Sequence, residues 1–317
     1  MNRHSWFRFL IPVLLLCTCC NWSYGSGIDT LIKNFANSDF IFQREISNTP
    51  FPPLAYLAYY NYSDSELRTS EGSSIEFDQS SLSQGLVFPW LISQRDALFA
   101  GEWISRNEFN TDSPHIDDFN VTSVGIPLGW LRQVNPHWQA AAFVFPIVHN
   151  SNLPQSKTSY EFMGGAFTRF VQTEHLWWGL GLFVDSDQGG DLYLPYIGLS
   201  WAASKQWTIS AIMPWPAILY SPTINTTFRI GSSPTGASWI LDQDNSDLYY
   251  DWDSWNFGFA YQQRIKDNFW LQVELGGSGL HNLSIQGDHW QSPELKADSS
   301  VFLGISLNWR PSAPSDP

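Results

Sequence analysis

The sequence predicts an all-β protein: a single antiparallel, up-and-down transmembrane β-barrel of about 12 to 14 strands. Three observations favour it: an N-terminal export leader, a last strand that alternates between apolar and small or polar residues, and an abundance of aromatic residues. Phe, Trp and Tyr make up 16% of the 317 residues, whereas charged residues make up only 15%. A high share of rings is typical of proteins whose strands cross two membrane interfaces.

The leader covers residues 1–25. Two arginines precede a short apolar run at 9–17, and the small residues Ser23 and Gly25 supply a cleavage site, so a signal peptide is expected. The run is too short to span a membrane as a helix, which takes about 20 residues. All three cysteines lie in this leader: Cys17, Cys19 and Cys20. Their flanking residues make a poor lipid-attachment motif, and the exported chain has no cysteine left for a disulfide.

The charge balance is acidic. The chain has 30 Asp and Glu residues against 16 Lys and Arg residues, of which two arginines lie in the leader. This excess of negative charge excludes nucleic acid as an expected partner. We also find no nucleophile elbow, P-loop, dinucleotide fingerprint or Cys/His metal spacing. The sequence therefore predicts neither an enzyme nor a cofactor or bound metal.

The segments follow from periodicity. Residues 26–53 have weak periodicity and end in a proline-rich break, which predicts a periplasmic N-terminal segment or a plug of the lumen. Residues 54–309 read as the barrel and 310–317 as a tail. The expected strands are 54–62, 83–92, 96–105, 119–131, 137–147, 159–171, 176–184, 192–201, 207–213, 223–230, 237–249, 255–263, 269–276 and 298–309. Connections between them alternate between short and long, as outer-membrane barrels require, and prolines at 127, 146, 195 and 214 must lie at bulges or strand ends.

The last strand carries the clearest signal. Val301, Leu303, Ile305, Leu307 and Trp309 share one face, and small or polar residues, apart from a phenylalanine at 302, share the other. Lipid outside and a wet lumen inside explain this pattern better than a soluble sandwich does. The tryptophans further fall near strand ends in two groups, which predicts two interfacial belts.

This strand resembles the C-terminal assembly signal of outer-membrane β-barrel proteins, with Gly304, Leu307 and Trp309 at its glycine, hydrophobic and aromatic positions; Phe302 departs from the pattern. Segments 192–201 and 207–214 are also similar to an uncharacterised barrel family with a domain of unknown function. The resemblance implies a bacterial outer-membrane location, with outer-membrane lipid and the barrel-assembly machinery as partners. It implies no activity.

Charged residues on barrel strands are the candidates for the lumen. Alternation directs them inward because none can cheaply face lipid; they are Glu102, Glu161, Arg169, Arg229 and Glu274. The alternatives are a selectivity ring and a hydrogen-bonded lumen that stiffens the barrel. Acidic residues crowd 185–191 and 242–253, where a solvated loop is favoured over a calcium site because the distal bidentate Glu is missing.

For function we expect an outer-membrane barrel that is a passive channel for small solutes as cargo, biased toward cations by its acidic residues. One alternative is a closed structural or surface-binding barrel, since bulky inward rings and residues 26–53 could fill the lumen. The second is a secreted, aromatic-rich β-sandwich that binds carbohydrate.

Overall fold

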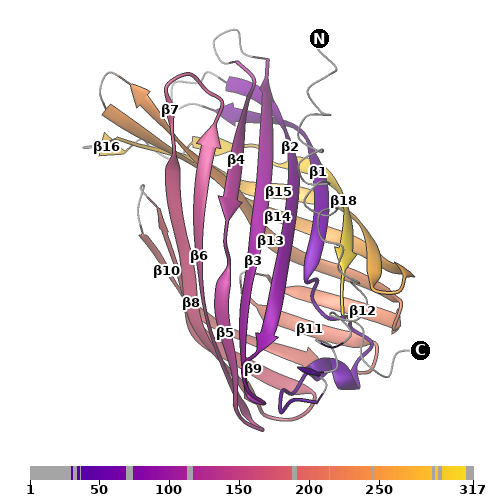
Figure 1. Cartoon of the computed structure of the whole chain (residues 1–317). Coiled ribbons are helices and arrows are strands. Elements are labelled where there is room, and N and C mark those ends of the chain that lie inside the picture. The colour runs from indigo at the N-terminus through magenta and orange to yellow at the C-terminus, as the bar shows by residue number, and fades with distance from the viewer. Residues whose placement is uncertain are drawn as a thin grey trace, which may run out of the picture.

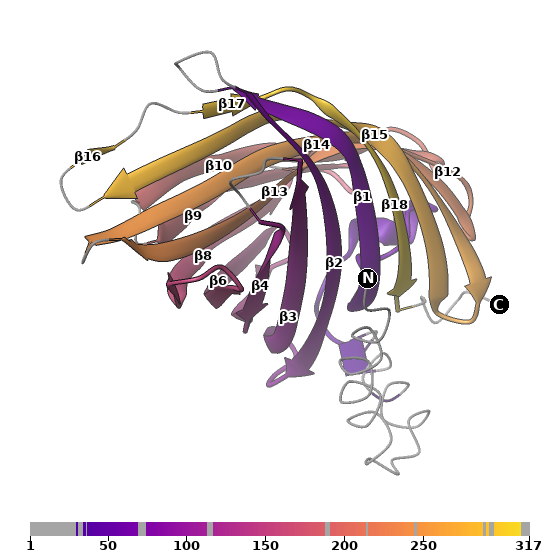
Figure 2. The same ribbon diagram turned by 90° about the horizontal axis from the view of Figure 1, so that it is seen from above.

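The chain folds into one antiparallel sheet that closes on itself. In the computed structural model β18 pairs with β15 on one side and with β1 on the other, which completes the ring. Figure 2 shows the strands following one another around the barrel, with β18 beside β1. The structure describes residues 30, 34–35, 37–68, 74–112, 117–187, 191–213, 215–243, 246–287, 290–291 and 295–311. The expected signal peptide and most of the expected tail lie outside these residues.

In the described part of the chain, the barrel has fourteen strand positions around its ring. Eighteen strand segments build them, because β4 and β5 form one interrupted strand, β7 leads into β8, and β16 and β17 lead into β18. The segments are β1 (Ala55–Arg68), β2 (Ser74–Leu91), β3 (Asp96–Thr111), β4 (Phe119–Gly125), β5 (Leu128–Asn135), β6 (Trp138–Ser151), β7 (Ser156–Lys157), β8 (Ser159–Val171), β9 (Leu176–Asp187), β10 (Asp191–Ala202), β11 (Trp207–Ile212), β12 (Ala217–Thr223), β13 (Thr226–Gln243), β14 (Ser246–Lys266), β15 (Phe269–Gly287), β16 (Trp290–Gln291), β17 (Leu295–Ala297) and β18 (Ser300–Trp309). The predicted barrel and strand number are confirmed.

The two ends of the barrel differ. One, called the turn end, carries the short hairpin connections from β2 to β3, β5 to β6 and so on to β14 to β15; the other is called the loop end. Several strands extend toward the loop end well beyond their predicted limits, for example β2 and β14 (Figure 1). Their extensions are polar or lack alternation, so the apolar pattern ends before the backbone pairing does.

The prediction was wrong in detail between residues 214 and 254. The expected loop 214–222 contains all of β12 except Thr223, and the expected strand 237–249 spans the connection between β13 and β14. The expected connections at 231–236 and 250–254 lie inside those two strands. One missed strand and one false one cancel, which is why the total remained correct.

Strand alternation separates a lipid face from an inner face. On β18, Val301 is 60% exposed whereas the neighbouring Phe302 is 1% exposed, and the alternation continues along the strand. Exposed leucines, isoleucines, valines and phenylalanines cover the outward faces of the other strands in the same way. Such a band would be unstable in water and matches the hydrocarbon of a bilayer. Among the described residues, no helix has the length and apolar character needed to cross a membrane.

The tryptophans do not all lie in belts. Trp90, Trp138, Trp178, Trp201 and Trp207 are outward and exposed near the turn end, as expected for an interfacial belt. Others that we expected in belts are inside the molecule: Trp103, Trp177, Trp239, Trp252 and Trp270. Distance along the chain from a strand end does not reveal which face of the strand a ring occupies.

The loop end is closed from within by the outer half of β13. This half leaves the wall and pairs with β7, with Ile240 opposite Lys157. One face of it packs on a buried cluster, called the loop-end cap, formed by Phe109, Val121, Ala237, Trp239 and Trp252. The other face meets β8, where the hydroxyls of Ser238 and Ser159 lie 3.3 Å apart. The cap thus lies inside the barrel at the loop end.

We predict that Trp239→Ala destabilises the barrel. The indole lies 5.4 Å from the Phe119 ring and 5.4 Å from the Tyr250 ring, so its removal leaves a large cavity in the cap. A Trp-to-Ala change at a buried site costs about 3–5 kcal/mol. The temperature at which the folded band converts to the unfolded band on a gel should fall clearly. Trp207→Ala, which removes an exposed ring, is the matched control; equal shifts for both would contradict the cap.

Strand pairing in the wall is interrupted beside the shifted half of β13, and we call this interruption the side notch. The β11–β12 hairpin is short, so 191–197 of β10 pair only with β9, and 232–239 of β13 pair only with β14. Pro195 and Pro234 lie on these two unpaired edges. Proline has no N–H to donate, and an edge strand tolerates it for that reason. The expectation of a bulge or strand end is wrong for Pro195, which lies inside β10 in regular register with β9, and for Pro146, which lies inside β6 opposite the break between β4 and β5. It is confirmed for Pro127, which lies in that break, and position 214 is outside the described residues.

The N-terminal segment lies across the turn end. Figure 1 shows it as an indigo stretch beneath the strands, and its 3-10 turn η1 (Gln43–Ile46) precedes β1. Side chains and backbone of this segment form hydrogen bonds to turns on opposite sides of the mouth. The contacts are Asp39 with Arg95, Ile41 with Gln133 and Gln139, Gln43 with His175 and Ser200, Asn48 with Lys205 and Ser221, and Thr49 with Thr208.

Candidate functional site

Inward-facing rings lie against glycines of neighbouring strands. A Cβ on Gly179 would lie 2.8 Å from the Tyr196 ring, and one on Gly181 would lie 2.7 Å from the Phe167 ring, both closer than real contacts allow. The same relation pairs Tyr56 with Gly85, Phe99 with Gly129, Phe145 with Gly125, Tyr60 with Gly304, and Phe302 with Gly276. Glycine lets a ring rest on the wall of the barrel. These rings therefore cover the wall more than they project into the lumen.

The two sides of the interior differ in packing. On the side of β1, β13–β15 and β18, inward residues such as Tyr62, Ala260, Glu274 and Phe302 are buried. On the side of β6 and β8–β10, inward rings remain accessible to solvent. We call this part of the interior the open wall. It consists of Phe143, Phe145, Phe167, Phe183 and Tyr196, with Arg169 on the same face of β8 as Phe167 and nearer the turn end. Inward residues that solvent reaches indicate empty space beside them.

The rings of the open wall contact each other. Phe143 stacks on Phe167 with 5.8 Å between centroids and 7° between planes, and Tyr196 meets Phe167 edge-on at 4.5 Å. Phe183 lies 6.3 Å from Phe143. Rings in mutual contact lose little side-chain freedom when a solute arrives, so the surface is prepared for an apolar or aromatic body.

Two of the predicted lumen residues neutralise each other. Arg229 Nη1 lies 3.5 Å from Glu274 Oε1 on the packed side. Glu274 Oε2 accepts hydrogen bonds from the Tyr60 hydroxyl and the Gln272 amide, each at 3.1 Å. This buried group satisfies its charges internally and stiffens the wall.

Glu161 belongs to a buried chain of hydrogen bonds. His149 Nε2 lies 2.8 Å from Glu161 Oε2, and His149 Nδ1 lies 2.7 Å from the Ser123 hydroxyl. A Ser–His–Glu series has the composition of a hydrolytic triad. Ser123, however, is 1% exposed beneath the loop-end cap, so a substrate has no access to its hydroxyl. The chain is a network that ties β4, β6 and β8 together.

Glu102 corrects our expectation, because it faces outward. It shares its face of β3 with the exposed Leu98, while Ala97, Phe99 and Trp103 share the inner face. The carboxylate accepts a hydrogen bond from the Gln84 amide of β2 at 3.3 Å. We assumed that a carboxylate avoids the lipid face. The inward rings and small residues of β3 fix the alternation of this strand, however, and Glu102 therefore lies on its outward face.

Arg169 has the most distinctive surroundings. Its guanidinium lies 4.5 Å from the centroid of the Trp177 ring, and its Nη1 donates a hydrogen bond to Gln139 Oε1 at 3.0 Å. Within the described ranges, no carboxylate lies within ion-pair distance of it. Gln139 is itself held, since its amide donates to Gln133 Oε1 at 2.6 Å. Arg169 is a fixed positive charge on the open wall.

Carboxylates gather near the loop end, outside the membrane-spanning part. Asp251 lies on β14 beyond Trp255, and its neighbours in the group are Glu161, Asp185, Asp187 and Asp253. Burial, and then repulsion by these neighbours, raises the pKa of Asp251 to about 8. No group of three or more potential metal ligands is found among the described residues.

This shift predicts a pH dependence. The pKa of Asp251 is higher in the folded state than the ordinary value of 3.8, so the folded state binds more protons between those two values. Stability should therefore fall as pH rises from about 4 to about 8. Asp251→Asn should weaken this fall in the temperature of unfolding, and Asp112→Asn, a loop-end carboxyl outside the group, should leave it unchanged. An unaltered pH profile in Asp251→Asn would refute the assignment.

The residues of the expected assembly signal occupy the closing strand. Leu307 faces lipid, Trp309 pairs with Ala55 and Phe269, and Gly304 lies beneath the Tyr60 ring. Their role in assembly stays a prediction.

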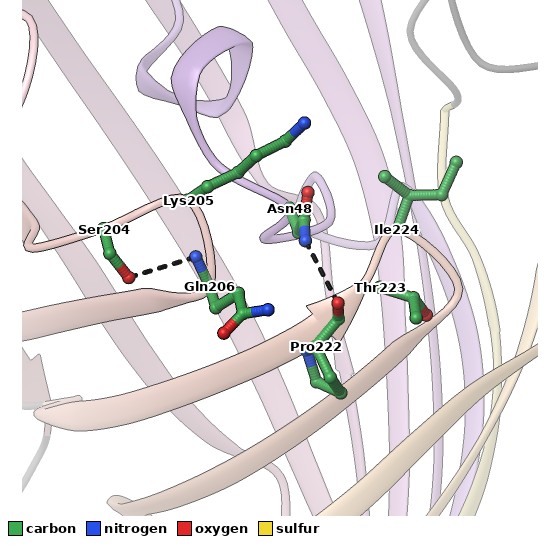
Figure 3. A pocket seen from close by; sticks show the side chains of 7 residues that line it. All are labelled: Asn48, Ser204, Lys205, Gln206, Pro222, Thr223 and Ile224. Carbon is green, nitrogen blue, oxygen red and sulfur yellow. Dashed lines mark hydrogen bonds between the residues drawn. The ribbon is translucent and has the colours of Figure 1, made fainter.

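A shallow pocket at the turn end carries no site. Figure 3 shows it between Asn48 and the β10–β11 and β12–β13 connections, where the Asn48 amide donates to the backbone oxygen of Pro222. Its remaining lining residues are Ser204, Lys205, Gln206, Thr223 and Ile224. The pocket lies where the N-terminal segment contacts these two turns.

Sequence reasoning missed the open wall. Bulky rings were expected inside the barrel, but the sequence analysis did not identify the pairing of inward rings with inward glycines across strands. Gly179, Gly181 and Phe183 lie at every second position of β9 and so share its inner face. This spacing is the sequence signal that could have revealed the open wall.

A model of the family described as "Domain of unknown function (DUF6268)" matches residues 101–310. The chain belongs to this family. A search of curated proteins finds no match for this member of the family. Among solved structures it is similar to the COG4313 outer membrane channel of Pseudomonas putida F1, with 11% identity, 84% of this chain and 100% of that chain covered, and a TM-score of 0.49. It is also similar to a Pseudomonas aeruginosa FadL homologue (12% identity, 81% and 89% covered, TM-score 0.41) and to the P. putida toluene transporter TodX (10%, 82% and 90%, 0.39). At these identities the likenesses concern the fold alone.

Proposed function

We propose that this protein is a passive channel of the bacterial outer membrane for small solutes with an apolar or aromatic part. The observation that carries the proposal is the open wall, where inward rings remain accessible and rest on glycines. A barrel with a purely structural role would gain stability from filling this space. The short turns are assigned to the periplasm and the loop end to the medium, as in other barrels of this kind.

The route we propose is indirect. The loop-end cap fills the axial path, so solutes reach the open wall through the side notch between β10 and β13. They leave at the turn end, where the N-terminal segment narrows the mouth. No catalytic step is part of this proposal.

Planar-bilayer recording of the purified protein tests the channel directly. Stepwise openings are expected, with a conductance reduced by solutes such as benzyl alcohol that occupy the open wall. Phe167→Ala should weaken that reduction, and Phe228→Ala, which removes an outward ring, should not. Complete silence in the wild type and in a variant lacking residues 26–53 would exclude a channel.

A second candidate, a closed structural barrel, is favoured by one observation: both ends are occupied, by the cap and by the N-terminal segment. The same recordings separate the two. Fractionation tests the location, because recovery of the mature protein in soluble form without detergent would contradict an outer-membrane protein.

A further inference from the structure

We propose that Arg169 and the adjoining rings bind a carboxylate carried on an aromatic or apolar body, so that the preferred solute is a small aromatic acid. This inference rests on the proposed channel and names its solute class. It starts from an imbalance among the arginines of the interior. Arg229 has Glu274 as its counter-ion, whereas Arg169 has no carboxylate partner among the described residues.

The guanidinium of Arg169 is fixed before any ligand arrives. Trp177, only 2% exposed, lies beneath it, and the indole of Trp177 donates a hydrogen bond to the backbone oxygen of Glu174 at 3.2 Å. On one edge Gln139 accepts a hydrogen bond from Nη1. Gln139 is anchored in turn by the backbone oxygen of Ile41, at 2.9 Å, in the N-terminal segment. A planar fork held in this way loses little freedom on binding a carboxylate.

The remaining donors of Arg169 face accessible space. The side chain is exposed although it shares the inner face of β8 with Phe167, so solvent reaches it from the lumen. Guanidinium presents five N–H donors, of which the contacts of the described residues use one, at Nη1. A carboxylate can accept two parallel hydrogen bonds from such a fork.

The apolar part of the ligand has a surface next to this charge. Phe167 is two residues from Arg169 on the same face, and Tyr196 and Phe143 contact Phe167. Gly179 lies opposite Arg169 on β9 and beneath the Tyr196 ring. A benzene ring placed against Phe167 would therefore have its carboxylate within reach of the guanidinium.

The charge pattern along the wall selects against more highly charged anions. Glu161 lies on the same face of β8, roughly 25 Å toward the loop end at the usual rise per residue, and Asp185 and Asp187 lie on β9 beside it. Entry from the loop end leads past these carboxylates, which repel a phosphate dianion more strongly than a monoanion with an aromatic body.

Equilibrium dialysis of benzoate against the detergent-solubilised, complete protein tests the site without requiring passage through a channel. Wild type should bind benzoate, and Arg169→Gln should lose roughly tenfold or more in affinity because a charged hydrogen bond is removed. Neutral benzyl alcohol should bind both proteins equally. Phe167→Ala should weaken the binding of both benzoate and benzyl alcohol. Arg132→Gln, which removes an exposed arginine at the turn end, should bind like wild type.

Each outcome decides the proposal. Unchanged benzoate affinity in Arg169→Gln would overturn it, as would displacement of benzoate by an equal concentration of inorganic phosphate. If Arg169→Gln does not give a heat-modifiable folded band, Arg169→Lys takes its place: it retains the charge but lacks the fork, and it should bind benzoate several-fold more weakly. Absence of conductance together with Arg169-dependent binding would exclude the channel and leave the binding site standing.

Discussion

Deletion of residues 26–53 is expected to raise the single-channel conductance of the protein several-fold. The deletion ends before β1, so the paired strands retain every partner. It removes the segment that crosses the turn end and its hydrogen bonds to Gln133, Gln139, Ser200 and Ser221. The conductance of a pore depends on its narrowest section, and this segment occupies the section opposite the loop-end cap.

The double variant Gln43→Ala/Asn48→Ala is the control for this deletion. It leaves the segment present but removes two of its side-chain anchors, Gln43 to Ser200 and Asn48 to Ser221. We expect brief, frequent openings of the size seen with the deletion, since the segment would leave the mouth only part of the time. Equal conductance in wild type and in the deletion would mean that the narrowest section lies elsewhere.

Replacement of both Leu307 and Trp309 by Ser should abolish the folded protein in the membrane. Leu307 faces lipid, and Trp309 forms register pairs with Ala55 of β1 and Phe269 of β15 at the closure of the ring. The pair also occupies the hydrophobic and aromatic positions of the expected assembly signal. We therefore expect an unfolded, degraded product, measured as loss of the heat-modifiable band.

The matched control uses the same strand and the same face. Val301 and Leu303 are outward and exposed like Leu307 but lie outside the signal positions. Val301→Ser/Leu303→Ser should lower stability and still assemble. If the two double variants behave alike, burial in lipid explains the loss and no assembly signal is needed.

Sequence patterns predicted what depends on local alternation. The barrel and both faces of β18 follow from the period of two residues along a strand. Prediction failed where the pattern is not local. β13 reads as two strands because its outer half leaves the lipid face and packs on Phe109 and Val121, and no pattern within residues 226–243 reveals those distant partners.

The site was predictable only in part. Arg169 was expected to face the lumen, but its lack of a counter-ion depends on which strands become neighbours. Glu102 was assigned by the cost of a charge in lipid, a weaker constraint than the inner face of β3, which Phe99 and Trp103 determine. Where a single polar residue and a whole strand face disagree, the strand face prevails.

The contact between inward rings and glycines also limits how this family can vary. Where a relative carries alanine or a larger residue at the position of Gly129, the ring at the position of Phe99 has no room and should be replaced by a smaller residue. Tyr196 and Gly179 should change together in the same way. Substitution histories at these paired positions should thus be correlated, although each pair lies far apart in the chain.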